Sequence, residues 1–475
     1  MNFKIKELID KVNQITDNAP LIYFTRDPER AVGLERLIKN FHIICIDNSY
    51  IVDELVKSGF DIFSTDKEGI VLPTNSTKDL VKDPKVQEKI KKISKGGKFY
   101  AQFFQYQMPT GILIKEMGGI IVNNSPEINR QLEDKLTQHK FFSRNNINIA
   151  DAVISNLSDY TYQDLAGVLG GKLVCQLNRS HSGKGTFFIN NEEDYIKIAN
   201  EYSGNEVKLS RFVNGQSYTI NALVRKNDNT LIGTLQYQII GYPQLAADMG
   251  TTVGNDWSYG SKIEPKLKAL VDLELFKIGK GLQVDGYLGH FGVDFILSDD
   301  NHPYIIEING RQTANSSLET KLSLMQDKTP LMLLHLVEFL GIDYEIDNNS
   351  IRDIQGSQIF LRSKKDGFKV NHELKSGVYR LQSDNSAIDW NTLQRKENVI
   401  FVDEEMDKPM IWQSDGYSVD QIKEGGFILL TSRNDSIKEK ADELVRMQFI
   451  DQIILDGKIS PWILEGMEEI ESMIK

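Results

Sequence analysis

Two carboxylates are predicted to face each other in a strand–turn–strand segment near residue 300. The stretch from Gly289 to Ser317 contains the strand GVDFIL, the turn SDDNHP and the strand YIIEING. The centre of the turn falls between Asp300 and Asn301, so we expect Asp294 and Glu307 directly opposite one another. Like charges in such a cross-strand pair repel, and a divalent cation between them removes the repulsion.

The second strand of this segment carries further polar side chains on the same face. Glu307, Asn309 and Arg311 alternate along the strand, whereas Ile306 and Ile308 point to the opposite, apolar face. Two carboxylates, an amide oxygen and a guanidinium on one face can hold Mg²⁺ and anionic oxygens together. The alternative is an ordinary solvated hairpin face, which the convergence of four polar groups disfavours.

A second polar segment, residues 172–190, is predicted as strand, loop and strand. Its loop brings together Ser182, Gly183, Lys184 and Gly185. Small residues let backbone N–H groups approach a phosphate, and Lys184 adds charge. Neither the P-loop pattern nor a GxGxxG fingerprint after the first strand occurs, so P-loop kinases and Rossmann dehydrogenases are poor candidates. Taken alone, this loop is better explained as an ordinary flexible hairpin.

The elements that must position these residues begin with an alternation of strands and helices. This alternation predicts a doubly wound α/β domain in the first ~120 residues. Later helices are expected from Pro126, with an apolar stripe of Leu132, Leu136 and Phe141, and from Pro265 to Gly279. The C-terminal part reads as β-rich and closed by a helix near 434–447. In the N-terminal part we expect strands at 21–24, 42–46 and 61–64 and helices at 30–41 and 51–60.

The amino-acid composition indicates a folded protein and argues against membrane-spanning and duplex-binding proteins. The 475 residues are 40% hydrophobic and 26% charged, with a net charge of −12, which is ordinary for a folded domain and unlike a duplex-binding protein. Cys45 and Cys175 lie in apolar runs and are expected to be buried thiols. The N-terminus lacks a signal-peptide core, and the most apolar stretch, 330–342, is too short to span a bilayer. We therefore expect a cytoplasmic protein with no membrane or nucleic-acid partner.

In their order along the chain, these features resemble the ATP-grasp superfamily over roughly residues 20–340. The resemblance rests on Asp134-Lys135, the glycine loop, the segment KLSRFVNGQSYTINALV, Asp294, and the run EINGR at 307–311. It is closest to the carboxylate–amine (peptide) ligases and more distant to biotin carboxylase.

The resemblance implies an α/β fold, α+β overall, in three parts. The expected boundaries are a doubly wound N-terminal α/β domain at 1–125, a two-lobed ATP-grasp domain at 126–345 with a flexible glycine loop near 179–186, and a small β-rich C-terminal domain at 346–475.

The resemblance also implies ATP and Mg²⁺ as cofactors, with Mn²⁺ as an alternative, and assigns roles by position. Arg311 and Lys184 are the expected catalytic residues. Asp294, Glu307 and Asn309 are the expected metal ligands. The expected ATP-binding residues are Lys135, Gln176, Ser182, Gly183, Lys184, Gly185, Arg211 and Val213.

Two positions depart from the family pattern. Gln176 stands where the strand before the glycine loop usually carries a second ATP lysine, and Ser210 stands where a hinge glutamate is common. Glutamine can donate a hydrogen bond to ATP but brings no charge, and Lys172 or Lys184 can compensate.

The implied activity is an ATP-dependent carboxylate–amine ligase that forms an amide or peptide bond through an acyl phosphate and releases ADP and phosphate. Its expected partners are ATP, a carboxylate and an amine, with amino acids or a small peptide favoured, and a homodimer is one option for its assembly. Two alternatives stay open. One is a biotin-carboxylase-like enzyme that activates bicarbonate, although the chain has no Met-Lys-Met biotin-attachment site. The other is a non-catalytic ATP-binding regulatory protein.

Overall fold

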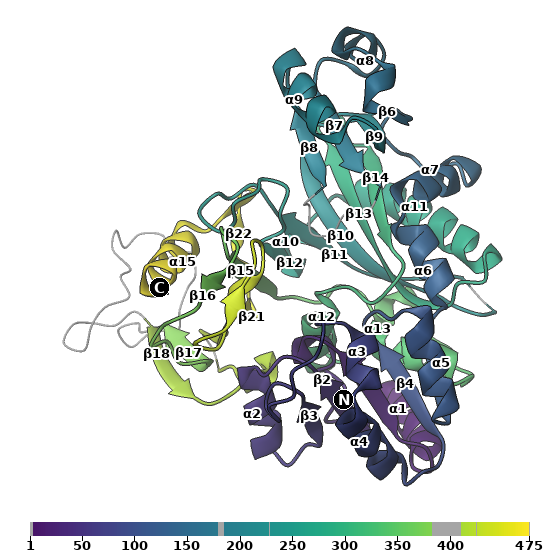
Figure 1. Ribbon diagram of the computed structural model, residues 1–475, viewed down its shortest axis with the longest axis vertical. Coiled ribbons are helices and arrows are strands. Elements are labelled where there is room, and N and C mark those ends of the chain that lie inside the picture. The colour runs from purple at the N-terminus through teal and green to yellow at the C-terminus, as the bar shows by residue number, and fades with distance from the viewer. Residues whose placement is uncertain (1–2, 179–184, 228, 382–409, 424, 475) are drawn as a thin grey trace.

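The computed structural model describes residues 3–178, 185–227, 229–381, 410–423 and 425–474. Figure 1 shows an N-terminal sheet covered by helices, a long central sheet with a smaller lobe projecting from it, and a β-rich C-terminal region beside the central sheet. The doubly wound N-terminal α/β domain and the β-rich C-terminal region are therefore confirmed.

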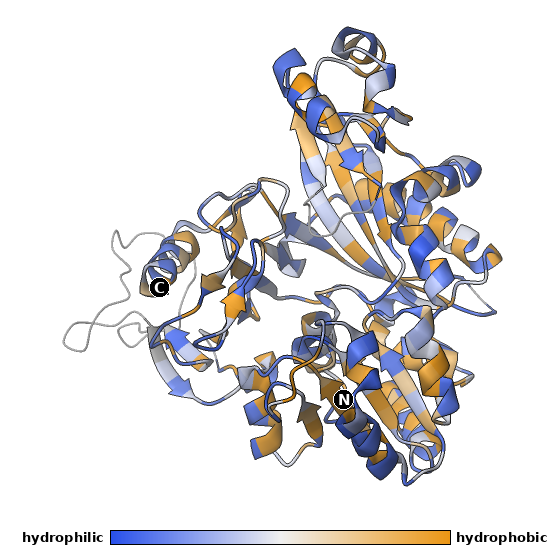
Figure 2. Ribbon diagram, in the orientation of Figure 1, coloured by the Kyte–Doolittle hydropathy of each residue, from blue (hydrophilic) through white to orange (hydrophobic). Residues whose placement is uncertain are grey.

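The N-terminal sheet has five parallel strands in the order β3-β2-β1-β4-β5. Parallel strands covered by helices are buried on both faces, which explains the continuous apolar run LIYFT in β1. Figure 2 shows these strands as largely hydrophobic, whereas the covering helices have hydrophilic faces. The elements are β1 (Leu21–Thr25), β2 (Phe41–Cys45), β3 (Ile62–Ser64), β4 (Phe99–Phe103), β5 (Gly119–Ile121), α1 (Phe3–Thr16), α2 (Tyr50–Lys57), α3 (Thr77–Lys82), α4 (Pro84–Ser94) and α5 (Met108–Glu116).

The prediction of a helix at 30–41 is wrong, because the structure has no α-helix in this segment. The chain makes a short 3-10 turn, η1 (Pro28–Arg30), and then continues in turns to β2. Gly33 has φ +126°, which an α-helix does not allow, and a Cβ there would lie 2.8 Å from the Thr320 side chain. The Glu35 carboxylate accepts a hydrogen bond from the Gly33 backbone N–H, which holds this irregular turn in place.

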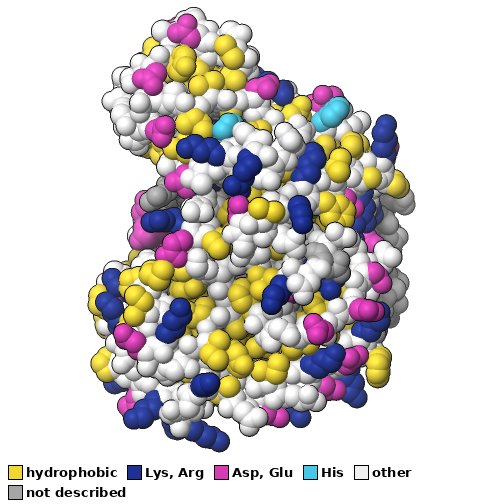
Figure 3. All heavy atoms as spheres, turned by 90° about the vertical axis from the view of Figure 1, so that its right-hand side faces the viewer, with side chains coloured by type: hydrophobic (Ala, Val, Ile, Leu, Met, Phe, Trp, Pro, Cys, Tyr) yellow, Lys and Arg dark blue, Asp and Glu magenta, His cyan; other side chains and the backbone are white. Residues whose placement is uncertain are grey.

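The small lobe is a four-stranded antiparallel sheet in the order β6-β9-β7-β8. In the space-filling view it forms the knob at the top of the molecule (Figure 3). Its elements are β6 (Ala152–Asn156), β7 (Leu173–Leu177), β8 (Thr186–Ile189), β9 (Glu206–Arg211), α8 (Tyr162–Leu169) and α9 (Glu192–Tyr202).

The central sheet has ten strands in the order β14-β13-β10-β11-β12-β15-β21-β19-β17-β18. The C-terminal strands therefore continue the central sheet through the β12–β15 pairing, rather than forming a separate one. The strands are β10 (Gly215–Val224), β11 (Leu231–Ile239), β12 (Gly254–Asp256), β13 (Gly289–Ser298), β14 (Pro303–Asn309), β15 (Ser357–Arg362), β17 (Gly377–Leu381), β18 (Met410–Ser414), β19 (Gly426–Thr431) and β21 (Glu443–Phe449).

The remaining described elements cover or extend this sheet. The longest helix runs from Pro265 to Val284, further than the expected end at Gly279. The elements are α10 (Trp257–Gly260), α11 (Pro265–Val284), α12 (Ser316–Met325), α13 (Leu331–Phe339), α15 (Pro461–Met473), β16 (Phe368–Lys369), β20 (Ile437–Lys438), β22 (Ile454–Leu455) and β23 (Lys458–Ile459).

Two helix expectations differ from the structure. The helix near 434–447 is wrong, because that segment contains β20 and β21, and the closing helix is instead α15. The helix from Pro126 is broken into α6 (Pro126–Glu133) and α7 (Lys135–Arg144). Asp134 interrupts it with ψ 115°, and its side chain accepts a hydrogen bond from the Thr137 backbone N–H at 2.9 Å. The break makes Lys135 the first residue of α7.

No helix among the described residues is long and apolar enough to cross a membrane. The face in Figure 3 carries charged side chains of both signs, interspersed with hydrophobic ones.

A buried polar network lies between the central sheet and α12. Thr313 Oγ1 donates to Asn221 Oδ1 at 2.8 Å, and Asn221 donates both to Asn315 Oδ1 at 3.1 Å and to the Glu319 carboxylate. Glu319 is only 4% exposed. Burial raises the pKa of Glu319 to about 7, against the lowering effect of its hydrogen bond from Asn221.

Replacing Glu319 by Gln is expected to remove part of the pH dependence of stability. Between the ordinary glutamate pKa and about 7, the folded chain holds a proton that the unfolded chain has lost, so stability falls as pH rises through this window. The loss amounts to about 3 kcal/mol. Denaturant unfolding of wild type and Glu319→Gln from pH 4.5 to 8 tests this expectation, and parallel stability profiles for the two proteins would contradict it.

Candidate active site

The predicted carboxylate pair is formed by β13 and β14. Asp294 lies directly opposite Glu307 in the antiparallel register, and the register shifts immediately afterwards, between Asp294 and Phe295. Asn309 pairs with Gly292, and its Nδ2 donates a hydrogen bond to Asp294 Oδ2 at 3.1 Å. The predicted pairing of Asp294 with Glu307 is confirmed, but the predicted turn centre is not, because the strands nearer the turn pair about Asp300. Three candidate metal-binding side chains lie together.

The electrostatics of this pair suit a divalent cation. Burial and the negative charge of Glu307 raise the pKa of Asp294 to about 6, while hydrogen bonds from Thr219 and Asn309 and the charge of Lys135 lower it. Asp294, Glu307 and Asn309 fit Mg²⁺ because a cation bound between the two carboxylates would relieve this repulsion. No group of three or more His, Cys, Asp and Glu side chains in the described part of the chain is placed to hold a metal. The remaining Mg²⁺ ligands would therefore come from the amide, water or phosphate.

Lys135 reaches this site from the start of α7. Its side chain is 5% exposed, and its Nζ lies 2.6 Å from Glu307 Oε2. Its backbone N–H donates to the carbonyl of Asn178 at 3.2 Å, which joins α7 to the chain just beyond β7. Lys135 is thus held between the carboxylate pair and the start of the glycine loop.

Lys208 is a charged residue at this site that sequence reasoning missed. In the β7–β9 pairing it lies directly opposite Gln176, so the two side chains share one face of the small-lobe sheet. Lys208 is 5% exposed and forms no ion pair with any described residue. Burial and the nearby charge of Lys135 lower the pKa of Lys208 to about 8, and Glu307 opposes this shift.

One feature of the sequence indicates that Lys208 could belong to the site. It lies two residues before Ser210, so along the strand it faces the same way as the predicted hinge position. Recognising its role also required the pairing of β7 with β9, which the sequence did not reveal.

The predicted adenine-binding segment joins the small lobe to the central sheet. Arg211 ends β9, and Val213 lies between β9 and β10 and is 7% exposed. The backbone N–H of Arg211 donates to the carbonyl of Asp151 at 2.9 Å, which ties this connection to the start of β6. The position between two lobes suits a hinge.

The glycine loop is described only at its end. Gly185 precedes β8, and its carbonyl accepts a hydrogen bond from the Leu177 N–H at 2.9 Å. The predicted phosphate-binding residues Ser182, Gly183 and Lys184 lie outside the described residues.

Arg311 lies beyond the end of β14, against the N-terminal domain. Its Nε is 3.3 Å from Glu133 Oε1, and its Nη1 donates to the carbonyl of Gln312 at 3.2 Å. Its guanidinium carbon lies 5.0 Å from the centre of the Phe104 ring. A weak contact from Nη2 to Asn309 Oδ1 at 3.5 Å connects it to the face that carries the predicted metal ligands.

The central part of the chain has the fold and the residue arrangement of an ATP-grasp domain, which confirms the predicted ATP-grasp fold. Residues 132–315 match the family model for the ATP-grasp domain, and this range contains the hairpin, the hinge and both buried lysines. No curated protein matches the chain.

Solved structures of similar fold cover nearly the whole chain. The carboxyaminoimidazole ribonucleotide synthase of Aspergillus clavatus, complexed with ATP, is 12% identical with a TM-score of 0.56, and the match covers 96% of this chain and 99% of that one. N5-carboxyaminoimidazole ribonucleotide synthetase from Thermotoga maritima is 12% identical with a TM-score of 0.53 and the same coverage. The biotin carboxylase domain of Hydrogenobacter thermophilus 2-oxoglutarate carboxylase, with MgADP, ADP and bicarbonate, is 11% identical with a TM-score of 0.55, covering 90% and 85%. At these identities the likeness establishes the shared fold.

Proposed function

We propose that the protein is an ATP-dependent carboxylate–amine ligase that forms an amide or peptide bond through an acyl phosphate. The observation that carries this proposal is the Asp294–Glu307 pair with two buried lysines, Lys135 and Lys208, beside it. Opposed carboxylates and concentrated positive charge suit a site that holds Mg²⁺ and the phosphates of ATP.

The proposed reaction has two balanced steps. A carboxylate oxygen of the first substrate attacks the γ-phosphorus of ATP, and the bond to the bridging oxygen breaks to release ADP. The amine of the second substrate then attacks the acyl carbon, phosphate leaves, and the amine loses a proton. When bound by Asp294, Glu307 and Asn309, Mg²⁺ would neutralise charge on the phosphates. Lys135 and Arg311 would orient the transferred group and stabilise its charge.

We also propose that Lys208 supplies the charge that Gln176 lacks. The two residues are cross-strand neighbours, so a lysine on either strand presents its ammonium to the same space. A buried ammonium with no ion pair among the described residues and a lowered pKa is suited to receive a phosphate, which restores the favourable environment of the charge.

Bicarbonate is a second candidate for the activated acid. The likeness to a biotin carboxylase domain solved with MgADP, ADP and bicarbonate favours its inclusion. A non-catalytic ATP-binding role is the third option, which the departures at Gln176 and Ser210 support.

The function is tested by incubating the protein with Mg·ATP and pooled amino acids and resolving nucleotides and new masses by mass spectrometry. Amino-acid-dependent ADP, with a product lighter by one water than its two substrates, supports the ligase. AMP in place of ADP would overturn the acyl-phosphate mechanism. ADP that depends on bicarbonate instead would favour the second candidate, and ATP binding with no turnover in either mixture would favour the third.

A further inference from the structure

A large cavity separates the N-terminal sheet from the C-terminal strands. Its volume is about 840 Å³, within the range of roughly 300–1,000 Å³ typical of small-molecule sites. Its floor consists of the residues that follow β1, β2, β3 and β4, and its roof comes from β15, β19, β20, β21 and the segments beside them. Ligands of open α/β sheets bind at this carboxyl edge of the strands.

One end of this cavity adjoins the candidate active site. The Phe104 ring contacts two guanidinium groups, at 5.3 Å from that of Arg30 and 5.0 Å from that of Arg311. Arg30 and Phe104 line the cavity, and Arg30 Nη1 also donates to the carbonyl of Ala314 at 2.7 Å, close in sequence to Arg311. A group bound at the Arg30 end would therefore lie next to the ATP-binding domain.

The same end contains a guanidinium, that of Arg362, with no direct ion pair among the described residues. Arg362 and Arg446 both lie against the Phe360 ring, at 5.0 and 4.9 Å from its centre. Arg446 is neutralised by Glu29 at 3.0 Å and Glu443 at 2.8 Å.

Arg362 forms no ion pair with any described residue. It donates instead to the backbone carbonyls of Thr252 at 2.7 Å and Ala441 at 3.0 Å. Burial lowers the pKa of Arg362 to about 10, with Arg30 and Arg446 adding repulsion and Glu443 opposing the shift. A carboxylate of a ligand would complete this site.

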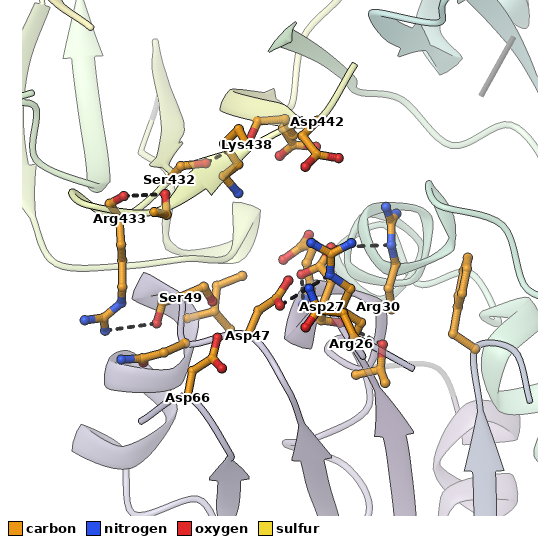
Figure 4. A pocket seen from close by; sticks show the side chains of 18 of the residues that line it. Arg26, Asp27, Arg30, Asp47, Ser49, Asp66, Ser432, Arg433, Lys438 and Asp442 are labelled. Atoms are coloured by element: carbon orange, nitrogen blue, oxygen red, sulfur yellow. Dashed lines mark hydrogen bonds and ion pairs between the residues drawn. The ribbon is translucent and has the colours of Figure 1, made fainter. Parts of the chain in front are cut away.

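The other side of the cavity carries two aspartates, Asp47 and Asp66, together with the cations Arg26, Arg433 and Lys438. Figure 4 shows Asp66 and Arg433 on the side away from Arg30, with Asp47 between Asp66 and Arg26. Asp47 lies 3.4 Å from Arg26, yet burial raises the pKa of Asp47 to about 6 despite Arg26 and Lys438. Asp66 has no ion pair with a described residue, and desolvation raises its pKa.

The cavity as a whole is electrically balanced. Its lining includes six Lys and Arg side chains and six Asp and Glu side chains. Of the roof residues labelled in Figure 4, Arg433 lies on the Asp66 side, whereas Asp442 lies above Arg26 and Arg30. Such a lining leaves no surplus of positive charge for a dianionic phosphate and favours a ligand with one charge of each sign.

We propose that this cavity binds the carboxylate substrate as a zwitterion, an amino acid or short peptide. Its carboxylate lies toward Arg30 and Arg362, next to the ATP-binding domain, and its ammonium lies toward Asp47 and Asp66. The inference rests on the proposed ligase function, and it gives the C-terminal region a role, because Arg362 and the roof residues come from that region.

The test measures binding without turnover. The full chain is titrated with L-amino acids and alanine-containing dipeptides at millimolar concentration, followed by ligand-detected NMR. We expect at least one zwitterion to bind, and its N-acetyl and carboxamide derivatives to bind about tenfold more weakly or worse. No binding by any of these zwitterions, equal binding by the derivatives, or displacement of the zwitterion by ribose 5-phosphate would overturn the proposal.

Variants separate this proposal from the proposed function. Asp47→Asn and Arg362→Lys should each weaken zwitterion binding by about tenfold. The control Asp17→Asn removes an exposed carboxylate outside the cavity lining and should leave binding unchanged. The thermal shift caused by a non-hydrolysable Mg·ATP analogue should persist in all three variants. If the wild-type protein shows no thermal shift with the ATP analogue, the proposed function alone is contradicted. If both cavity variants bind the zwitterion as wild type does, the cavity assignment alone is contradicted.

Discussion

Glu307→Gln is expected to reduce ATP turnover by about 100-fold or more while the protein stays folded. The substitution keeps the shape of the side chain but removes one of the two carboxylates that face each other across β13 and β14. It also removes the counterion of Lys135, whose Nζ lies 2.6 Å from Glu307 in the structure. The substitution therefore changes both the proposed metal-binding face and the placement of Lys135, the proposed phosphate lysine.

Two measurements test the Glu307 expectation. ADP release is compared at saturating Mg·ATP, and the Mg²⁺-dependent thermal shift with a non-hydrolysable ATP analogue is compared because it needs no knowledge of the acceptor. Asp299→Asn is the matched control, since it removes an exposed carboxylate from the turn of the same hairpin. Turnover within about twofold of wild type, with an unchanged melting temperature, would show that Glu307 does not contribute to the metal site.

The local part of the site was largely predictable because a short turn limits the registers that a hairpin can adopt. The strands next to the turn pair about Asp300 rather than between Asp300 and Asn301, and the register shift after Asp294 then brings Asp294 opposite Glu307, where the prediction placed it. In the same way, the apolar run of β1 predicts a strand buried on both faces.

Features that depend on distant parts of the chain were not predictable in this way. The segment 30–41 has a helical pattern, but Gly33 packs against Thr320 and adopts φ +126°, so a contact with α12 overrides the local preference. The cavity needs residues from the ends of four N-terminal strands together with Arg362 and Lys438, and no spacing in the sequence relates those segments.

The departure at Gln176 illustrates the same limit. On its own strand, Gln176 occupies the position where the family usually has a lysine. Across the β7–β9 pairing it lies beside Lys208, and the positive charge is present on the adjacent strand. A lysine that is missing from one strand can therefore be supplied by its cross-strand neighbour, which the order of residues along a single strand does not reveal.

Lys208→Gln is expected to lower kcat/KM for ATP by about 10- to 100-fold, mainly through a higher KM. A hydrogen bond to a charged group contributes about 1.5–3 kcal/mol, and each 1.4 kcal/mol corresponds to about tenfold in affinity. The melting temperature should stay the same or rise, because the variant removes a buried ammonium whose pKa is lowered to about 8. Loss of activity together with equal or greater stability distinguishes a role in ATP binding from a structural role.

The decisive variant exchanges the two side chains. Gln176→Lys combined with Lys208→Gln returns one lysine to the same face of the sheet, so we expect most of the lost ATP affinity to be recovered. Lys140→Gln, which changes an exposed lysine on α7, serves as the control and should behave like wild type.

ATP affinity is measured by titration calorimetry with Mg²⁺ present. If Lys208→Gln binds ATP as wild type does, the phosphates do not contact this lysine. If the single variant is impaired but the exchange restores nothing, the charge is needed at position 208 itself, and the proposed equivalence of the two strands is wrong.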